Sequence, residues 1–380
     1  MRIKITRFFV GGFFLLSLWT MPQVRAENNV TLANVLTKLK IKGRAAMGYL
    51  RGGRMSSFPS GSFDIPDAKI IFNFFPDNNI DLTARFNLNN AGGSAASGAT
   101  NAPLVDYLYI QGKDFIPSLK GTPWSLNGRL GRAKIGVGEE TWSDNPIEGP
   151  LPSNSAAALG GSDELVELSG KFWAVSIGNG SRGVVTDTSV AKAVYARLFY
   201  TPLDSLYISG YYYNSGQLGI TSSEASIAGL VAVPAGATNW KRQVWGGDIR
   251  YDFKKGKKFV KPLFFSDSKA AFRVSLAQFK DSVRGAANRN GTFGHIDGIY
   301  NFTSSFFVAA RLSGIQLAGS QTQSINTVTT HYYGRASLGG GYRWSDNVCV
   351  KLSYDYNKNG GAGTNDANDD LVSVLLTMAL

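Results

Sequence analysis

Apolar and polar residues alternate with a period of two along most of the chain, most clearly near its C-terminal end. Within residues 371–380 every second residue from Val372 to Leu380 is apolar, and residues 348–356 and 331–344 show the same alternation. Successive side chains of a β-strand point to opposite faces, so alternation over about ten residues predicts a strand with one apolar face. No stripe with the 3.6-residue period of an amphipathic helix appears here. This region is therefore predicted to be all-β.

The connections between these segments alternate in length. Tight turns, such as residues 345–347, are followed by long polar loops, such as residues 357–370. Short turns at one end and long loops at the other, with an even number of strands, are typical of transmembrane antiparallel β-barrels. We therefore expect an all-β barrel of about sixteen strands, with fourteen or eighteen as alternatives. The strands are expected near residues 39–50, 67–75, 80–89, 103–111, 125–137, 163–170, 172–178, 190–200, 205–213, 243–253, 270–279, 293–302, 306–315, 331–344, 348–356 and 371–380.

The first residues have the composition of a secretory signal peptide. Basic residues precede an apolar stretch from Phe8 to Trp19, and Val24-Arg25-Ala26 provides a small-x-small cleavage site. We expect residues 1–26 to be removed on export and residues 27–380 to form the barrel; an uncleaved anchor helix is the alternative. Removal of four cations would lower the formal net charge from +12 to +8, so the mature chain stays basic.

The composition excludes several other classes of protein. The chain of 380 residues is 43% hydrophobic and 12% aromatic, which is too apolar for a disordered protein. Beyond the N-terminus it has no apolar run of about 18 residues, which excludes a polytopic helical membrane protein. Its single cysteine, Cys349, excludes a disulfide framework and a cysteine-rich metal site. No cofactor and no metal are expected.

The apolar face of each strand is expected to meet lipid, because a membrane barrel turns its apolar side chains outward. Aromatic residues gather at the strand ends, as at Tyr200, Tyr342 and Trp344, which predicts an aromatic girdle at each membrane interface. The opposite face is polar and charged, and charges would be costly in a packed core but not in a water-filled channel. A barrel of about sixteen strands is wide enough to hold such a channel.

The predicted inward face carries more cations than anions. Rings of basic side chains attract anions, so we expect a preference for anionic solutes. In the alternative interpretation these cations pair with inward acids or hold loops against the wall. The expected pore-lining and anion-binding residues are Lys40, Lys42, Arg44, Lys69, Arg85, Arg129, Arg132, Lys134, Arg197, Arg250, Arg273, Arg311, Arg335, Arg343 and Lys351. The expected inward acids are Asp81, Asp106, Glu167, Asp248, Asp252, Asp297 and Asp355.

The fifth predicted strand departs from simple alternation, and a long loop follows it. A β-bulge near Gly131 would reconcile the two parities and turn Arg129, Arg132 and Lys134 all inward. Loop 138–162 contains three prolines, which favour a fixed conformation. We expect this loop to fold into the barrel as a constriction, with a loop outside the barrel as the alternative. Its candidate constriction residues are Glu139, Glu140, Trp142 and Asp144.

Two segments resemble the phosphate-selective and related general diffusion porins of Gram-negative bacteria. They are Leu39-Lys40-Ile41-Lys42-Gly43-Arg44 and Gly128-Arg129-Leu130-Gly131-Arg132-Ala133-Lys134-Ile135-Gly136, which match a basic first strand and a basic segment before an inward loop. The resemblance implies a homotrimer in the outer membrane, in contact with outer-membrane lipids and lipopolysaccharide. The chain departs from these porins at its end, because it has Leu380 where most of them have Phe.

The leading hypothesis is therefore passive diffusion of small hydrophilic solutes through a water-filled channel with a preference for anions. The sequence has no Gly-x-Ser-x-Gly, His-Glu-x-x-His or P-loop motif, so no enzyme is expected. A lipid-modifying barrel enzyme using His295 or His331 and a structural or adhesive barrel are the alternatives. His295 is expected to face the lumen beside Asp297. No nucleic-acid partner is expected, because the protein is exported and its charges point inward.

Overall fold

The structure is a computed structural model of the 380-residue chain. It describes residues 36–88, 105–136, 138, 146–157, 159–180, 191–219, 226–231, 233–253, 268–325, 328–360 and 368–379. Several predictions fall outside these ranges. They concern the signal peptide, the proposed constriction residues Glu139, Glu140, Trp142 and Asp144, the terminal Leu380, and the basic stretch 254–261, for which the sequence favours a solvated loop over a site for anionic lipid headgroups.

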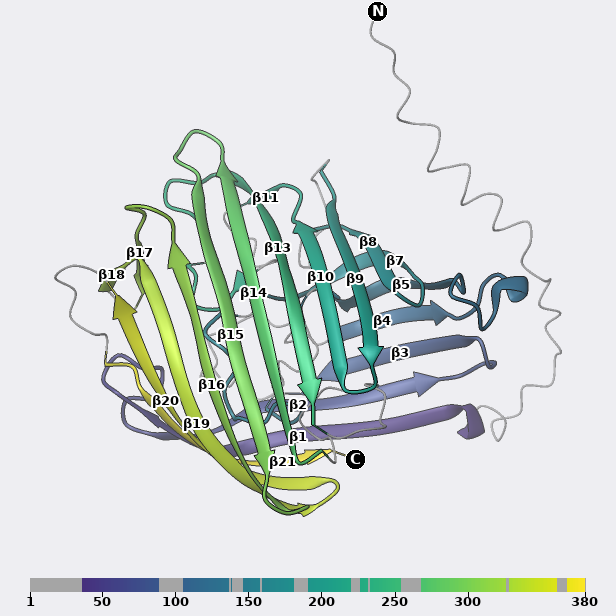
Figure 1. Cartoon of the computed structure of the whole chain (residues 1–380), viewed down its shortest axis with the longest axis horizontal. Helices are drawn as coiled ribbons and strands as arrows, with labels where there is room; N and C mark the ends of the chain where they lie inside the picture. The colour runs from purple at the N-terminus through teal and green to yellow at the C-terminus, as the bar shows by residue number, and fades with distance from the viewer. Residues whose placement is uncertain are drawn as a thin grey trace, which may run out of the picture. The chain divides into compact units, whose positions relative to one another are not determined.

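The chain divides into two units, Met1–Leu39 and Lys40–Leu380. In the first, the structure describes only a helical turn at residues 36–38 and the first residue of β1. The second is a closed barrel of antiparallel strands (Figure 1). No helix in the described ranges is long and apolar enough to cross a membrane.

Sixteen strands build the barrel wall, as the sequence predicts. Each follows its neighbour in the chain as an antiparallel partner, and β1 pairs with β21 from Arg44–Ala379 to Gly52–Leu371, which closes the sheet. The strands are β1 (Leu39–Gly52), β2 (Ser62–Phe74), β3 (Ile80–Asn87), β4 (Val105–Gly112), β5 (Asn127–Lys134), β7 (Ser162–Ser169), β8 (Trp173–Gly178), β9 (Ala193–Leu203), β10 (Leu206–Asn214), β13 (Asn239–Asp252), β14 (Ala270–Val283), β15 (Arg289–Asn301), β16 (Phe306–Leu317), β19 (Tyr332–Ser345), β20 (Val348–Gly360) and β21 (Leu371–Ala379).

The remaining elements are short and lie in the connections. They are the 3₁₀ helix η3 (Pro117–Leu119) and the strands β6 (Leu159–Gly160), β11 (Leu218–Gly219), β12 (Ser226–Ile227), β17 (Gln323–Ile325) and β18 (Val328–Thr330). Two of the predicted tight turns are present, since β15 and β16 are separated by residues 302–305 and β19 and β20 by residues 346–347.

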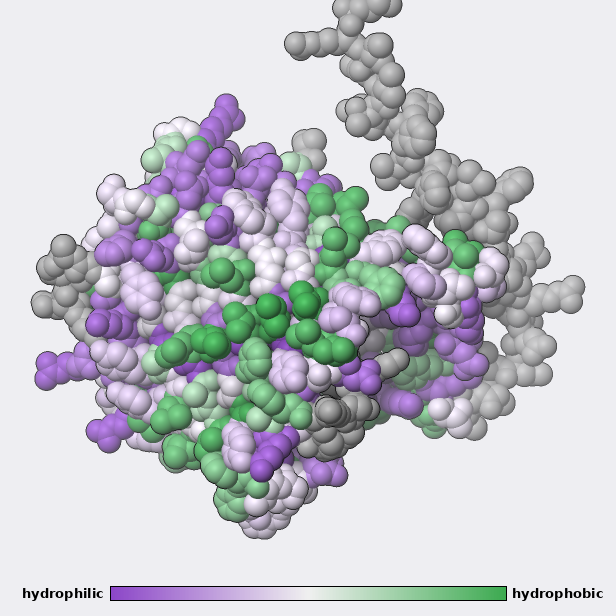
Figure 2. Space-filling view, viewed as in Figure 1, coloured by the Kyte–Doolittle hydropathy of each residue, from purple (hydrophilic) through white to green (hydrophobic). Residues whose placement is uncertain are grey.

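The two faces of the wall follow the alternation of the sequence. On β20, Leu352 and Tyr354 are exposed, whereas Lys351, Ser353 and Asp355 between and beside them are buried. The exposed positions point outward, and the buried ones point into the barrel. Figure 2 shows apolar side chains gathered in a band across the strands of the near face, with hydrophilic side chains above it.

Aromatic side chains form the predicted girdle at the turn-side ends of the strands. Tyr342 of β19 packs against Phe306 of β16, with ring centroids 4.7 Å apart, and against Trp344 at 6.5 Å. Tyr300 and Phe302 pack edge to face at 4.9 Å one hairpin away. Rings of aromatic residues at the end of an apolar outer band are typical of barrels that span a membrane.

The β-bulge predicted near Gly131 is not present. The pairing of β5 with β4 and with β7 runs without a register shift, although Gly131 has a positive φ of 124°. A continuous strand places residues an odd number apart on opposite faces. By parity Arg132 and Lys134 fall on the face of the exposed Leu130, opposite to Arg129, although Arg132 is itself buried. The inward positions beyond Gly131 are taken by the buried Ala133 and Ile135.

Candidate functional site

The described part of the long loop after β5 lies inside the barrel, as the sequence predicts. Lys351 of β20 is fully buried, and its Nζ donates hydrogen bonds to the carbonyl oxygens of Pro146, Ile147 and Gly149 at 2.7, 2.9 and 2.6 Å. Since Lys351 points inward, the chain at residues 146–149 must run along the inner wall. We call residues 146–161 the inward segment.

Three further wall residues hold the middle of the inward segment. Arg311 of β16 donates to the carbonyl oxygen of Ser153 at 2.9 Å, and the Ser153 hydroxyl donates to Asp355 of β20 at 2.8 Å. Arg335 of β19 donates to the carbonyl oxygen of Asn154 at 3.0 Å. A charged donor strengthens a hydrogen bond to a backbone carbonyl, so these contacts fix the backbone of the segment against β16, β19 and β20.

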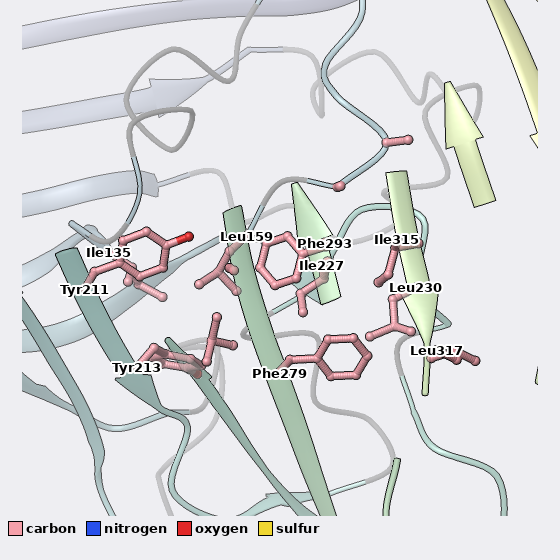
Figure 3. Close-up of a cluster of buried hydrophobic side chains, with 14 of the residues drawn as sticks. Ile135, Leu159, Tyr211, Tyr213, Ile227, Leu230, Phe279, Phe293, Ile315 and Leu317 are labelled. Carbon is pink, nitrogen blue, oxygen red and sulfur yellow. The ribbon is translucent and has the colours of Figure 1, made fainter. Parts of the chain in front are cut away.

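The end of the inward segment enters an apolar cluster inside the barrel. There β6 pairs with β12, a short strand of the connection between β10 and β13. Figure 3 shows Leu159 from the first connection and Ile227 and Leu230 from the second beside Phe279, Phe293 and Ile315 of the wall. Burying each of these large side chains contributes about 1.5–3 kcal/mol, so two connections and one wall form a packed layer within the barrel.

The strands β1 to β4 carry a network of charged side chains, and Glu148 of the inward segment lies 4.0 Å from Arg44 at one end of it. Arg44 of β1 pairs with Asp67 of β2 at 2.8 Å, and Asp106 of β4 receives both Lys69 at 2.9 Å and Arg85 at 2.6 Å. The guanidinium carbon of Arg85 also lies 3.5 Å from the ring centre of Tyr107. These side chains are largely buried against each other, so most of their positive charge is compensated by a neighbouring carboxylate.

Arginines and aromatic rings continue this network around the barrel. Arg129 of β5 donates to Glu167 of β7 at 2.8 Å and lies over the ring of Tyr109 at 5.3 Å. Arg197 of β9 donates to the hydroxyl of Tyr207 on β10, and Arg250 of β13 lies over the same ring at 4.9 Å. A cation over a ring face gains electrostatic stabilisation, so each ring helps to orient its guanidinium.

Behind the inward segment a single carboxylate lies beside two arginines and a histidine. Asp297 of β15 accepts from Arg273 at 2.8 Å and lies 3.6 Å from both Arg311 and the imidazole of His295. His295 is buried and faces inward beside Asp297, as the sequence predicts. Because the ring faces inward and not toward the apolar outer face, this arrangement gives no support to the lipid-modifying alternative.

One charged cluster was missed by the sequence reasoning. Arg242 of β13 and Arg289 of β15 both bind Asp281 of β14, with Arg242 bidentate at 2.7 and 2.9 Å and Arg289 at 2.8 Å. Arg289 also donates to the carbonyl oxygen of Val231 in the second inward connection, at 2.9 Å. The alternation of Asp248 and Arg250 continues back to Arg242, so extending the predicted strand by a few residues would have revealed its inward position.

The other predicted lining residues lie near the ends of strands. Lys40 and Lys42 are exposed, with Lys40 over the ring of Phe75 at 5.3 Å. Arg343 donates to the carbonyl oxygen of Ser304 at 3.1 Å in the adjoining turn. Arg132, on the other parity of β5, donates to Glu164 at 2.7 Å. None of these four is brought together with the residues that hold the inward segment.

The described inward cations are therefore mostly engaged. The structure adds buried acids, Asp67, Asp163 and Asp281, and buried arginines, Arg242 and Arg289, to those predicted from the sequence. The inward surface is consequently closer to charge balance than the sequence predicts. These contacts fit the alternative interpretation of the sequence. Arg44 and Arg129 pair with acids, and Arg311, Arg335 and Lys351 hold the inward segment against the wall.

The sequence matches no family model and no curated protein. Solved structures do match. An anion-selective porin from Comamonas acidovorans is 10% identical, with 90% of this chain and 98% of that chain covered and a TM-score of 0.55. The outer membrane channel DcaP of Acinetobacter baumannii is 10% identical, with 90% and 97% covered and a TM-score of 0.56. The chain has a porin-like fold.

A third solved structure has a similar fold. OmpT, an outer membrane protein of Vibrio cholerae, is 8% identical over 90% of this chain and 97% of that chain, with a TM-score of 0.58, and one matching structure of it is a trimer. At such identities the likeness is one of fold alone, and it assigns no role to a side chain of this chain.

Proposed function

We propose that this chain forms a water-filled channel in the outer membrane for passive diffusion of small hydrophilic solutes. The observation that carries the proposal is the closed sixteen-stranded barrel with charged side chains on its inner wall and apolar side chains outside. A barrel of this size leaves room for water, which solvates charges that a packed core would exclude. The porin-like fold supports the same conclusion.

The inward segment provides the constriction in this proposal. It lies against β16, β19 and β20, and its Glu148 lies 4.0 Å from Arg44 of β1. Solutes would therefore pass between it and the charged wall of β2–β10. That wall offers the guanidinium groups of Arg85 and Arg129, each held beside a carboxylate. Because guanidinium groups bind carboxylate and phosphate oxygens in a planar fork, we infer a preference for anions over cations.

The experiment is conductance across a planar bilayer containing the purified mature chain, with different KCl concentrations on the two sides. We expect discrete open steps and a reversal potential that shows faster passage of chloride than potassium. Absence of any conductance would overturn the channel, and a potential directed toward potassium would overturn the anion preference.

We propose further that the mature protein begins at Glu27 and assembles as a homotrimer, with no catalytic activity. The trimeric form of a protein with this fold supports the assembly state. The mass of the protein isolated from outer membranes would test the cleavage site. Chemical cross-linking followed by heat dissociation would test the trimer, and a ladder that stops at the monomer would contradict it.

A further inference from the structure

Two arginines and two tyrosines form a patch on the inward face of β3, β4 and β5, which are neighbours in the sheet (Figure 1). On β4, Leu108 is exposed on the outward face, so Tyr107 and Tyr109 on either side of it face inward. Arg85 of β3 pairs directly with Tyr107, and Arg129 of β5 reaches the ring of Tyr109. We call these four inward residues the arginine–tyrosine patch.

The register of β3 with β4 gives Arg85 two neighbours of different chemistry. Arg85 pairs with Tyr107 but Phe86 pairs with Val105, so Asp106 is an extra residue on β4. In such a bulge two residues of one strand oppose one residue of the other. Nε and Nη2 of Arg85 lie 2.8 and 2.6 Å from one carboxylate oxygen of Asp106, and its guanidinium carbon lies 3.5 Å from the ring centre of Tyr107. The carboxylate therefore occupies one edge of the guanidinium group, and the ring covers one of its faces.

Arg129 has a similar arrangement on the other side of β4. Its Nη2 donates to Glu167 of β7 at 2.8 Å, and its guanidinium carbon lies 5.3 Å from the ring centre of Tyr109. Because Tyr107 and Tyr109 are two residues apart on one strand, the two stacked guanidinium groups follow each other at a spacing of about 7 Å. The side chains of Arg85 and Arg129 are 13% and 10% exposed, so neither group is sealed by its partners.

The patch keeps a positive charge after its ion pairs are taken into account. The neighbouring Arg44 and Asp67 compensate each other at 2.8 Å. Three cations then face two carboxylates, which leaves one positive charge that an anionic solute can neutralise. The cations are Lys69, Arg85 and Arg129, and the carboxylates are Asp106 and Glu167.

We propose that the arginine–tyrosine patch binds planar aromatic carboxylates as they pass through the channel. A guanidinium group stacks on a flat aromatic ring, and its open face meets the lumen when a tyrosine covers the other. The ring of the solute would lie on one guanidinium group while its carboxylate reaches the next. Phosphate is bound through a guanidinium edge, and Asp106 already occupies one edge of Arg85. This inference rests on the proposed channel and names the class of solute that its charged wall favours.

The experiment measures block of the chloride current through a planar bilayer that contains the full mature chain at pH 7. Benzoate is the probe, and cyclohexanecarboxylate is its matched control, because it has the same charge and a similar size but no aromatic face. We expect benzoate to halve the chloride current at a concentration about twofold to tenfold lower than cyclohexanecarboxylate, which is the range that a cation–π contact supplies. Inorganic phosphate and the uncharged benzamide should both block more weakly than benzoate.

Four variants assign the effect to the patch. Arg85→Lys/Arg129→Lys keeps two cations but removes their flat groups, and Tyr107→Leu/Tyr109→Leu removes the rings that support them. In both variants benzoate and cyclohexanecarboxylate should block at equal concentrations. Tyr107→Phe/Tyr109→Phe keeps the rings and should distinguish the two probes as the wild type does. Tyr200→Leu is the control, because it removes an exposed ring from the outward face of β9.

The possible outcomes separate this inference from the proposed channel. A wild type that conducts but is blocked equally by benzoate and cyclohexanecarboxylate, or more strongly by phosphate, would overturn this inference alone. Discrimination that survives in the lysine variant would also overturn it, since binding would then lie elsewhere in the lumen. The lysine variant gives this answer even where the leucine variant fails to fold, because lysine can still pair with Asp106 and Glu167. Absence of any current from the wild type would overturn both the channel and this inference.

Discussion

Lys351 Nζ on β20 lies 2.6 Å from the carbonyl oxygen of Gly149 in the inward segment. The same ammonium group reaches two further carbonyl oxygens of this segment, so one lysine uses all three of its donors on one stretch of backbone. This contact ties the beginning of the inward segment to the wall, whereas the apolar cluster around Leu159 holds its end.

Replacement of Lys351 by methionine should release the beginning of the inward segment. The side chain would keep its volume but leave three carbonyl oxygens without their donor, at a cost of about 3 kcal/mol. We expect larger and noisier single-channel currents than in the wild type. Lys358→Met is the matched control, because Lys358 lies on the same strand but is exposed on the outward face. Currents equally steady in both variants would show that Lys351 does not hold the segment.

Replacement of Asp281 by asparagine should destabilise the barrel near its loop side. Two buried guanidinium groups, those of Arg242 and Arg289, would then face each other without their shared carboxylate. Removing one partner from a buried charged cluster costs about 3–5 kcal/mol. The denaturant midpoint of the purified chain should fall accordingly, whereas Asp346→Asn in an exposed turn should leave it unchanged. A midpoint unaffected by Asp281→Asn would contradict the structural role of this cluster.

Arg129 and Arg132 should differ in their effect on selectivity, although both are arginines of β5. Arg129 faces inward beside Glu167, so Arg129→Gln would leave a carboxylate exposed to passing ions. We expect the chloride-to-potassium permeability ratio to fall about twofold to fivefold, from about 0.5–1 kcal/mol of altered interaction. Arg132→Gln, on the other parity, should leave the ratio unchanged. An equal effect of both substitutions would contradict the register of β5.

The anion preference should weaken as salt concentration rises. The charged wall of β2–β10 is partly solvated in the proposed channel, and the screening length shortens from about 10 Å at 0.1 M salt to about 3 Å at 1 M. Reversal potentials measured at a fixed gradient ratio but rising mean concentration should therefore approach zero. A chloride-to-potassium permeability ratio that does not change with salt concentration would indicate that the channel selects ions by size and not by charge.

Much of the barrel could be predicted because each strand repeats the alternation of outward apolar and inward polar residues. The expected boundaries of β19 and the tight turn before β20 agree with the structure to within one or two residues. The prediction was wrong where the alternation of apolar and polar residues breaks, around Gly131. The break predicted a β-bulge, but the strand continues without one, and the apolar Ala133 and Ile135 take inward positions. Apolar inward residues are unexpected in a channel wall until the apolar cluster they pack against is known.

The pairing of the inward charges could not be predicted from alternation. The parity of a residue gives its face, but its partner depends on which strands are neighbours and on their register. Asp281 binds Arg289 from eight residues away and Arg242 from 39 residues away in the sequence. The contacts of Lys351 lie more than 200 residues away, in a loop whose path no local pattern encodes.

The sequence by itself determined that the chain forms a barrel with an apolar outside and a charged inside, because side-chain alternation is a local property of an extended backbone. It also indicated that a proline-containing loop after β5 enters the barrel. Only the tertiary structure decided which charges compensate each other, which wall the inward segment covers, and that two connections share an apolar cluster in the lumen. Those features depend on closure of the sheet, which brings side chains from distant strands to within hydrogen-bonding distance.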